Sequence, residues 1–124
     1  MPATNGRAMK AKGSQFEPDV CTFLREHGFP HAERHYGAGQ PDDVGDIDGV
    51  VGWTLEVKNC KGIDLAGWSD ETEAERVNGR QPFAAVIAKR RNRPTADAYV
   101  ILTLATIACL LAEDHLFLAD EGPA

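Results

Sequence analysis

The chain has 124 residues, of which 43% are hydrophobic and 26% are charged, as is usual for a single soluble globular domain. A chain of this length buries roughly two-thirds of the surface that it exposes when unfolded, so it can form its own core. These values exclude multidomain, collagen-like and charged disordered chains. Its three cysteines form no C-x-x-C pair, and residues 1–13 lack the apolar core of a signal peptide, so we expect a cytosolic protein.

The charge is unevenly distributed. The net charge of −6 argues on its face against a nucleic-acid partner, but all 13 basic residues lie between positions 7 and 93, where they meet 14 of the 19 acidic residues. The densest basic cluster is the segment K-R-R-N-R at residues 89–93. Because phosphate attraction acts over a Debye length of about 8–10 Å, a local basic surface can still bind DNA.

The first third of the chain predicts one helix and one short strand. Residues 1–12 are expected to form a flexible arm before a single domain over residues 13–118, and residues 119–124 a flexible tail. Ser14 and Glu17 form the S-x-x-E capping box of a helix that ends at Gly28. A strand over about residues 30–36 and a loop over residues 37–44, rich in glycine and aspartate, follow.

The middle of the chain predicts a hairpin and a second helix. Residues 45–51 and 53–59 form the two strands of the hairpin. Asp64 is the expected N-cap of a helix that runs to about Val77 and stops at Asn78-Gly79. Trp68 is assigned to the core. The acidic residues of this helix are interpreted as a solvated face; they are Asp70, Glu71, Glu73 and Glu75.

The last third predicts two buried strands, over residues 83–88 and 98–102, and a core-facing helix from Ala105 to about Glu113. The uncharged run over residues 98–112 is shorter than the roughly 20 residues of a membrane span, so we expect no membrane role. The expected order is therefore α-β-β-β-α-β-β-α, an α/β fold in which a mixed sheet is flanked by helices.

The hairpin carries the residues that indicate chemistry. Asp46 and Asp48 lie two apart on one strand and so share a face, and Glu56 and Lys58 do the same on the next strand. The hairpin can bring the two faces together, and carboxylates held so close need a cation among them. Hard oxygen ligands suit Mg²⁺, or Mn²⁺, which lowers the pKa of bound water and stabilises charge on a phosphate. Lys58 can then orient the attacking water or accept its proton.

The alternative is structural. The segment T-L-E-V-K-N is also typical of a half-exposed strand with a solvated E-x-K pair. Asp46, however, lies on an apolar strand next to glycine, where an acid has little structural purpose. The capping box accounts for Glu17 without a catalytic role.

The arrangement resembles the PD-(D/E)xK nucleases, and within them the archaeal and phage Holliday-junction resolvases. The matching segments are K-G-S-Q-F-E at residues 12–17, G-F at residues 28–29, G-D-I at residues 45–47 and E-V-K-N at residues 56–59. The similarity extends over about residues 12–112. Two positions depart from the pattern, since Gly45 replaces the proline before the aspartate and Pro18 replaces a basic residue after the helix glutamate.

The resemblance implies a restriction-endonuclease-like core and a set of site residues. Asp46, Glu56 and the carbonyl of Val57 would bind the metal, Lys58 would be the catalytic lysine, and Glu17 would reach the metal directly or through water. Asp48 would be an accessory acid. The expected DNA-binding residues are Lys12, Ser14, Lys61, Lys89, Arg90, Arg91 and Arg93.

The function that the resemblance implies is metal-dependent hydrolysis of DNA phosphodiester bonds in recombination and repair. We expect a resolvase that cuts four-way junctions as a homodimer, in the cytoplasm of a bacterial host if the chain is phage-encoded, and that recognises DNA by shape and backbone charge. A nicking or restriction-like nuclease, and a catalytically silent DNA-binding module of the same fold, remain as alternatives.

Overall fold

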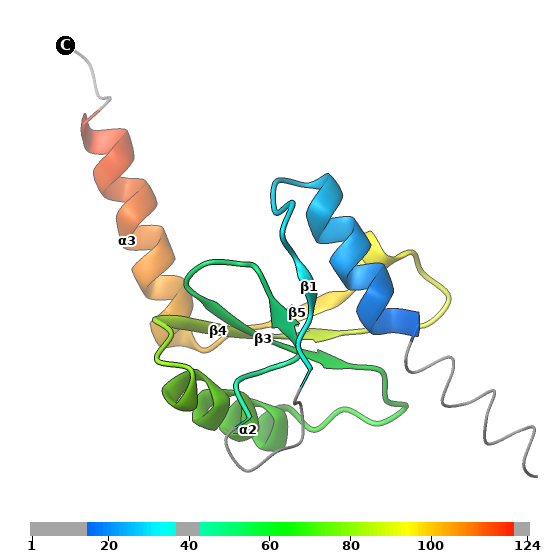
Figure 1. The fold of residues 1–124 in the computed structure, drawn as a ribbon. Coiled ribbons are helices and arrows are strands. Elements are labelled where there is room, and N and C mark those ends of the chain that lie inside the picture. The colour runs from blue at the N-terminus through cyan, green and yellow to red at the C-terminus, as the bar shows by residue number, and fades with distance from the viewer. Residues whose placement is uncertain (1–14, 37–42, 121–124) are drawn as a thin grey trace, which may run out of the picture.

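A five-stranded mixed sheet with the strand order β1-β2-β3-β4-β5 organises the protein in the computed structural model (Figure 1). The structure describes residues 15–36 and 43–120, and side chains only as far as residue 113. A helix over residues 15–26, here called the N-terminal helix, comes first. The elements that follow are β1 (Glu33–Arg34), β2 (Ile47–Asp48), β3 (Trp53–Lys58), α2 (Leu65–Asn78), β4 (Phe83–Ala88), the 3-10 turn η1 (Thr95–Asp97), β5 (Tyr99–Ile101) and α3 (Leu104–Asp120). The prediction of an α/β fold is confirmed.

The central pair of strands is parallel, and the outer pairs are antiparallel. β3 runs parallel to β4, with Lys58 opposite Ala88, and α2 makes the connection between them. β2 pairs antiparallel with β3, with Ile47 opposite Leu55. The carboxyl ends of β3 and β4 therefore lie side by side at one edge of the sheet, where the chain leaves both strands for a loop.

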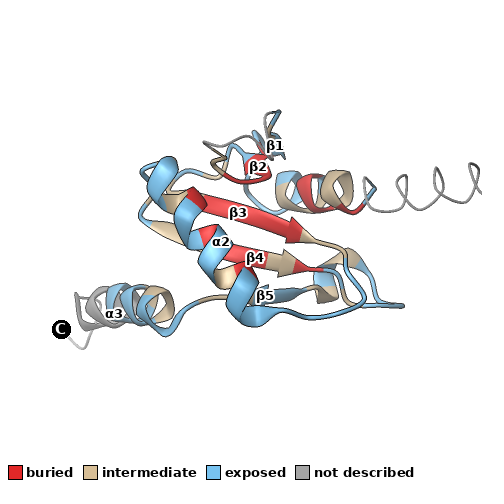
Figure 2. Cartoon of the chain, turned by 90° about the horizontal axis from the view of Figure 1, so that it is seen from below, coloured by how far each residue is buried: buried red, intermediate tan, exposed pale blue. Residues whose placement is uncertain are grey.

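The N-terminal helix and α2 cover opposite faces of the sheet (Figure 1). On one face, Phe16 and Val20 of the N-terminal helix belong to the same buried cluster as Leu55. On the other face, Trp68 of α2 packs with Val86 of β4, so its assignment to the core is confirmed. Figure 2 shows that β3 and β4, which both helices cover, are the most buried strands. Along β3, Glu56 and Lys58 alternate with Leu55, so their side chains point to the opposite face of the sheet, toward α2.

The predicted end of the N-terminal helix at Gly28 and the predicted N-cap of α2 at Asp64 are both confirmed. Gly28 has a φ of +105°, and the N–H of Phe29 donates to the carbonyl of Leu24 at 3.0 Å, which is the pattern of a helix that ends in a left-handed residue. At the start of α2, the carboxylate of Asp64 accepts a hydrogen bond from the N–H of Gly67.

The strands on the β1 side are shorter than predicted. β1 and β2 have two residues each, against the predicted ranges 30–36 and 45–51. The chain leaves β2 at Gly49, which has a φ of +90° and approaches the backbone of His31 so closely that a Cβ would clash with its carbonyl. A left-handed residue cannot continue the ladder, and this ends the strand.

The C-terminal part departs furthest from prediction. β5 is an edge strand, and Tyr99 and Val100 are 46% and 58% exposed, so the prediction of a buried strand is wrong. α3 continues past Glu113 to Asp120 and leads away from the sheet in both views (Figures 1 and 2). Leu104 and Leu111 are 81% and 60% exposed. The prediction of a core-facing helix is therefore also wrong.

Parts of three predicted segments lie outside the described residues. They include the whole of the predicted arm over residues 1–12 and residues 37–42 of the predicted loop. The predicted tail begins at residue 119, but the backbone there is still helical, and only residues 121–124 lie outside the description. In the described part of the chain, no helix has both the length and the apolar character that crossing a bilayer requires.

Candidate metal-dependent active site

The turn into β2 brings the carboxylate of Asp46 against β3. Its Oδ2 accepts a hydrogen bond of 2.7 Å from the N–H of Val57, and its own N–H donates to the carbonyl of Leu55 at 2.8 Å. Gly45, just before it, has a φ of +109°, and a Cβ there would lie 3.1 Å from the Leu55 carbonyl oxygen. Proline, whose φ is fixed near −65°, cannot adopt this conformation, so the glycine at this position has a structural reason.

Asp46 and Glu56 form a buried pair of carboxyl groups. Both residues are buried, and their side chains interact directly. Burial, aided by the charges of Glu56 and Glu17, raises the pKa of Asp46 to about 8, although the N–H of Val57 opposes this. Burial and the neighbouring Glu75 raise the pKa of Glu56 to about 8 as well. Two such groups cannot both be ionised at neutral pH unless a cation compensates them.

Lys58 supplies a positive charge beside this pair. Its Nζ lies 3.0 Å from Glu71 Oε2 and 3.6 Å from Glu56 Oε1. Burial lowers the pKa of Lys58, but Glu71 and Glu56 outweigh that effect and raise it above its usual value. The lysine is therefore a fixed ammonium beside the two carboxyl groups.

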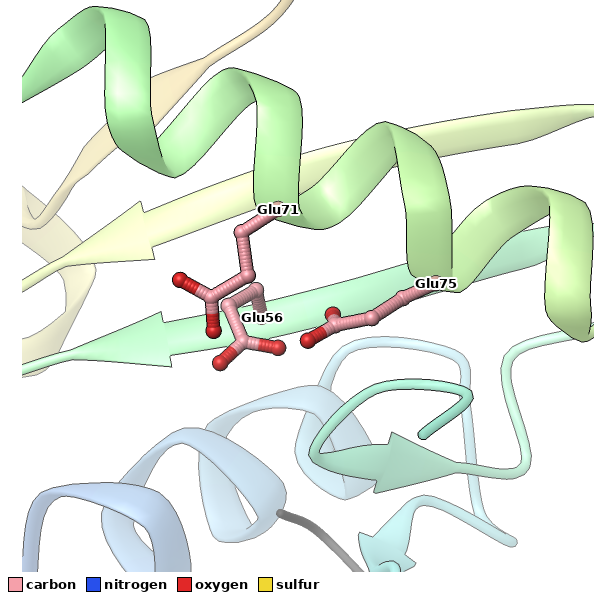
Figure 3. Close-up of side chains that lie close together, drawn as sticks. All are labelled: Glu56, Glu71 and Glu75. Atoms are coloured by element: carbon pink, nitrogen blue, oxygen red, sulfur yellow. The ribbon is translucent and has the colours of Figure 1, made fainter. Parts of the chain in front are cut away.

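The structure adds two acids from α2 that the sequence had assigned to a solvated face. Carboxylate oxygens of Glu56, Glu71 and Glu75 all lie within 4.8 Å of one another, and Figure 3 shows the three side chains converging between α2 and β3. Glu75 is only 3% exposed, so the interpretation of a solvated face is wrong for this residue. Glu71 and Glu75 follow Trp68 by three and seven residues, the spacing of one helix face, and this was the available signal.

Glu17 and Asp48 have partners of their own. Glu17 forms an ion pair of 3.0 Å with Arg34, yet its charge still contributes to the raised pKa of Asp46. The carboxylate of Asp48 lies 3.0 Å from Nδ1 of His35. The hairpin thus joins Asp46, but not Asp48, to Glu56. Ser14, the predicted capping partner of Glu17, lies outside the described residues, as does Lys12.

The basic loop over residues 89–93 begins beside the site. The N–H of Lys89 donates to the carbonyl of Lys58 at 2.9 Å. Arg90 stacks over the ring of Tyr99 at 5.5 Å, and Arg93 lies 3.5 Å from Asp97. Arg91 and Lys61 are exposed. Positive charge and buried acids therefore occupy the same edge of the sheet, at the carboxyl ends of β3 and β4.

Comparison with known proteins adds no relative: no family model, curated protein or solved structure matches this chain. The chemistry of the site therefore follows from its geometry. Buried carboxylates suit a hard divalent cation, and the second oxygen of Glu56, Oε2, is buried without a hydrogen-bond partner. An oxygen of this kind is available as a metal ligand, so the residues present fit Mg²⁺ or Mn²⁺.

Proposed function

We propose that this chain is a divalent-metal-dependent DNA endonuclease with a PD-(D/E)xK site. The observation that carries the proposal is the buried contact between Asp46 and Glu56, with Lys58 Nζ 3.6 Å from Glu56. Two acids and an amine on one face of a hairpin are the groups that metal-assisted phosphodiester hydrolysis requires. Without a cation or a proton to compensate them, two ionised carboxylates buried together would destabilise the fold.

The proposed roles divide among the turn before β2, strand β3 and the N-terminal helix. Asp46, Glu56 and the carbonyl of Val57 would hold the metal, which activates water and stabilises the charge of the phosphate. The N–H of Val57 fixes one oxygen of Asp46, leaving the other for a metal. Glu17 is close enough to act on the charge of Asp46 and would reach the site through water.

Lys58 would act on the attacking water and the phosphate. Its ammonium is held by carboxylates from a strand and from α2, so it can orient water or neutralise an oxygen of the phosphate without a large loss of side-chain entropy. The reaction would leave a 5′-phosphate and a 3′-hydroxyl.

The proposed substrate is a four-way DNA junction, which the basic loop over residues 89–93 would bind through the phosphate backbone. The loop starts next to Lys58, so DNA held by it would lie across the acids. Lys61, three residues beyond Lys58, is exposed on the segment that leaves β3. Contacts to phosphates position DNA without reading its sequence, which suits recognition of branched shape.

The proposed assembly is a homodimer, because a junction offers two equivalent strands to be cut. α3 provides an apolar surface for it. Leu104, Ala108 and Leu111 are exposed at the spacing of one helix face. Burial of these exposed apolar side chains against a second copy of the chain would stabilise the dimer. The enzyme would act in the cytoplasm, that of a bacterial host if it is phage-encoded.

The test is cleavage of labelled DNA. The protein is incubated with a four-way junction, a linear duplex and a single strand of the same sequence, with Mg²⁺ or with EDTA. Paired, metal-dependent nicks in the junction alone would support a resolvase, whereas cleavage of all three substrates would indicate a general nuclease. Binding without cleavage by the wild type, under conditions in which Mg²⁺ is bound, would refute an enzymatic role.

A further inference from the structure

The acids of α2 extend the cluster beyond the proposed active site. Glu71 and Glu75 lie one helical turn apart, and both reach Glu56 across the gap between α2 and β3 (Figure 3). The resemblance to PD-(D/E)xK nucleases assigns no role to either residue. The apolar contact of α2 with the sheet is made by Trp68, which packs with Val86 and Ala88 of β4, so a buried acid such as Glu75 is not required for that packing.

Two observations independent of the clustering indicate a ligand. Oε2 of Glu75 and Oε2 of Glu56 are both buried without a hydrogen-bond partner, and both residues are more than nine-tenths buried. A buried carboxylate oxygen without a partner is costly, so a native fold that keeps two of them in one cluster of glutamates needs a compensating positive group. Lys58 compensates the charge of Glu71 and of one oxygen of Glu56, but it leaves these two Oε2 atoms without a positive partner.

We infer that Glu56, Glu71 and Glu75 form a second divalent-cation site, with Glu56 shared between this site and the one at Asp46. The inference rests on the proposed function only in that Glu56 is a ligand of both. Three carboxylates from a strand and a helix offer the hard oxygen donors that Mg²⁺ and Mn²⁺ prefer. The side chain of Glu71 is 46% exposed, so an ion can enter from solvent and keep some of its waters.

Occupation of this site would also affect Lys58. Glu71 is the closest partner of the lysine, and a cation bound to Glu71 would compete with the ammonium for the same carboxylate. Lys58 would then be held mainly by Glu56, on the side of Asp46. The second cation would in this way couple metal binding on α2 to the position of the proposed catalytic lysine.

The competing explanation is a proton. Glu56 and Glu75 interact directly, and a single proton shared between them would also compensate the two oxygens. The two explanations differ in the number of metal ions that the chain binds, which can be counted without any DNA cleavage.

The experiment counts Mn²⁺ ions bound to the full chain by electron paramagnetic resonance at neutral pH. The wild type should bind two Mn²⁺ per chain. The double variant Glu71→Gln, Glu75→Gln should bind one, and Asp46→Asn should also bind one. Glu73→Gln is the matched control, because Glu73 lies on the same helix but pairs with Arg76, and it should bind two. Far-UV circular dichroism verifies folding, and Glu71→Gln alone, at a half-exposed side chain, should weaken one of the two sites by at least about tenfold.

The possible results separate the two proposals. A wild type that binds one Mn²⁺, lost in Asp46→Asn and retained in the α2 double variant, overturns the second site and leaves the proposed function intact. One Mn²⁺ that is lost in the double variant and retained in Asp46→Asn instead contradicts the assignment of Asp46 as a metal ligand. A wild type that binds no Mn²⁺ overturns both.

Discussion

Lys58 of β3 is held by Glu71 of α2, with 3.0 Å between Nζ and Oε2, thirteen residues further along the chain. This ion pair connects the E-x-K segment to a helix that the motif does not include. The amine is therefore positioned by the parallel β3-α2-β4 unit as well as by its own strand. Because the amine is held in this way, we expect that a small displacement of Lys58 would lower the rate of DNA cleavage more than the affinity for DNA.

Replacement of Lys58 should separate cleavage from binding. Lys58→Ala should reduce the cleavage rate by at least about 100-fold, the usual range for a proton-transfer or charge-stabilising group, while affinity for a junction changes little. Lys61→Ala is the comparison from the same segment: as a proposed phosphate contact it should weaken junction binding but retain the single-turnover cleavage rate at saturating protein concentration. Single-turnover rates and gel-shift affinities measure the two effects, and a Lys58→Ala variant that cuts at a normal rate would show that the lysine has no catalytic role.

The two buried acids should be essential for cleavage and dispensable for binding. Asp46→Asn or Glu56→Gln should lower cleavage by more than the roughly 10–100-fold typical of residues that only support a ligand. Junction affinity should stay equal or increase, because less negative charge faces the phosphates. Asp48→Asn, at the acid that pairs with His35, serves as the comparison. Near-normal turnover of Asp46→Asn would require a different metal site.

Stability without metal should decrease as pH rises. The pKa values of Asp46 and Glu56 are about 8 in the folded chain, against usual values of 3.8 and 4.5. Between about pH 4 and pH 8 the folded state therefore binds more protons than the unfolded state, so the free energy of unfolding falls over this range as pH increases.

Urea denaturation in EDTA at a series of pH values measures this effect. Mg²⁺ should reduce the loss of stability by compensating the ionised acids, and Glu56→Gln should flatten the pH dependence in EDTA. A free energy of unfolding that rises between about pH 5 and pH 8 in the metal-free wild type would contradict burial of these acids.

The basic loop should account for part of the salt dependence of DNA binding. Replacing Arg90, Arg91 and Arg93 with alanine should weaken binding and flatten the plot of affinity against salt concentration, by a slope of about one for each phosphate contact removed. Arg80→Asn is the control: it removes one positive charge just after α2, at a residue whose φ of +54° asparagine tolerates. The salt dependence of DNA binding by this control should equal that of the wild type. An unchanged salt dependence in the triple variant would exclude the loop from the DNA interface.

α3 should carry the dimer. Leu104→Glu together with Leu111→Glu places charge on its exposed apolar face and should convert a dimer to a monomer in light scattering coupled to gel filtration. Leu65→Glu, at an exposed leucine of α2, should leave the dimer intact. A wild type that is monomeric at every concentration tested would refute the assembly.

The sequence predicted those features that depend on neighbours along the chain. The helix stop at Gly28 and the cap at Asp64 follow from local hydrogen bonds. Alternation along β3 is equally local, and it correctly placed Glu56 and Lys58 on one face. The spacing of the motif by itself is therefore enough to indicate a cluster of acids and one amine.

Only the tertiary structure decided which other groups join that cluster. Glu71 and Glu75 looked like part of a charged helix surface; their spacing from Trp68 places them on its side of α2, but the sequence does not reveal that this side meets Glu56 of β3. The packing of Trp68 against Val86 fixes that rotation and turns both glutamates toward Glu56. The sequence did not predict the exposure of α3 for a similar reason. An apolar run indicates that a surface will be buried but does not say against what. The position of β5 at the edge of the sheet leaves the apolar surface of α3 uncovered within the chain and so open to a partner.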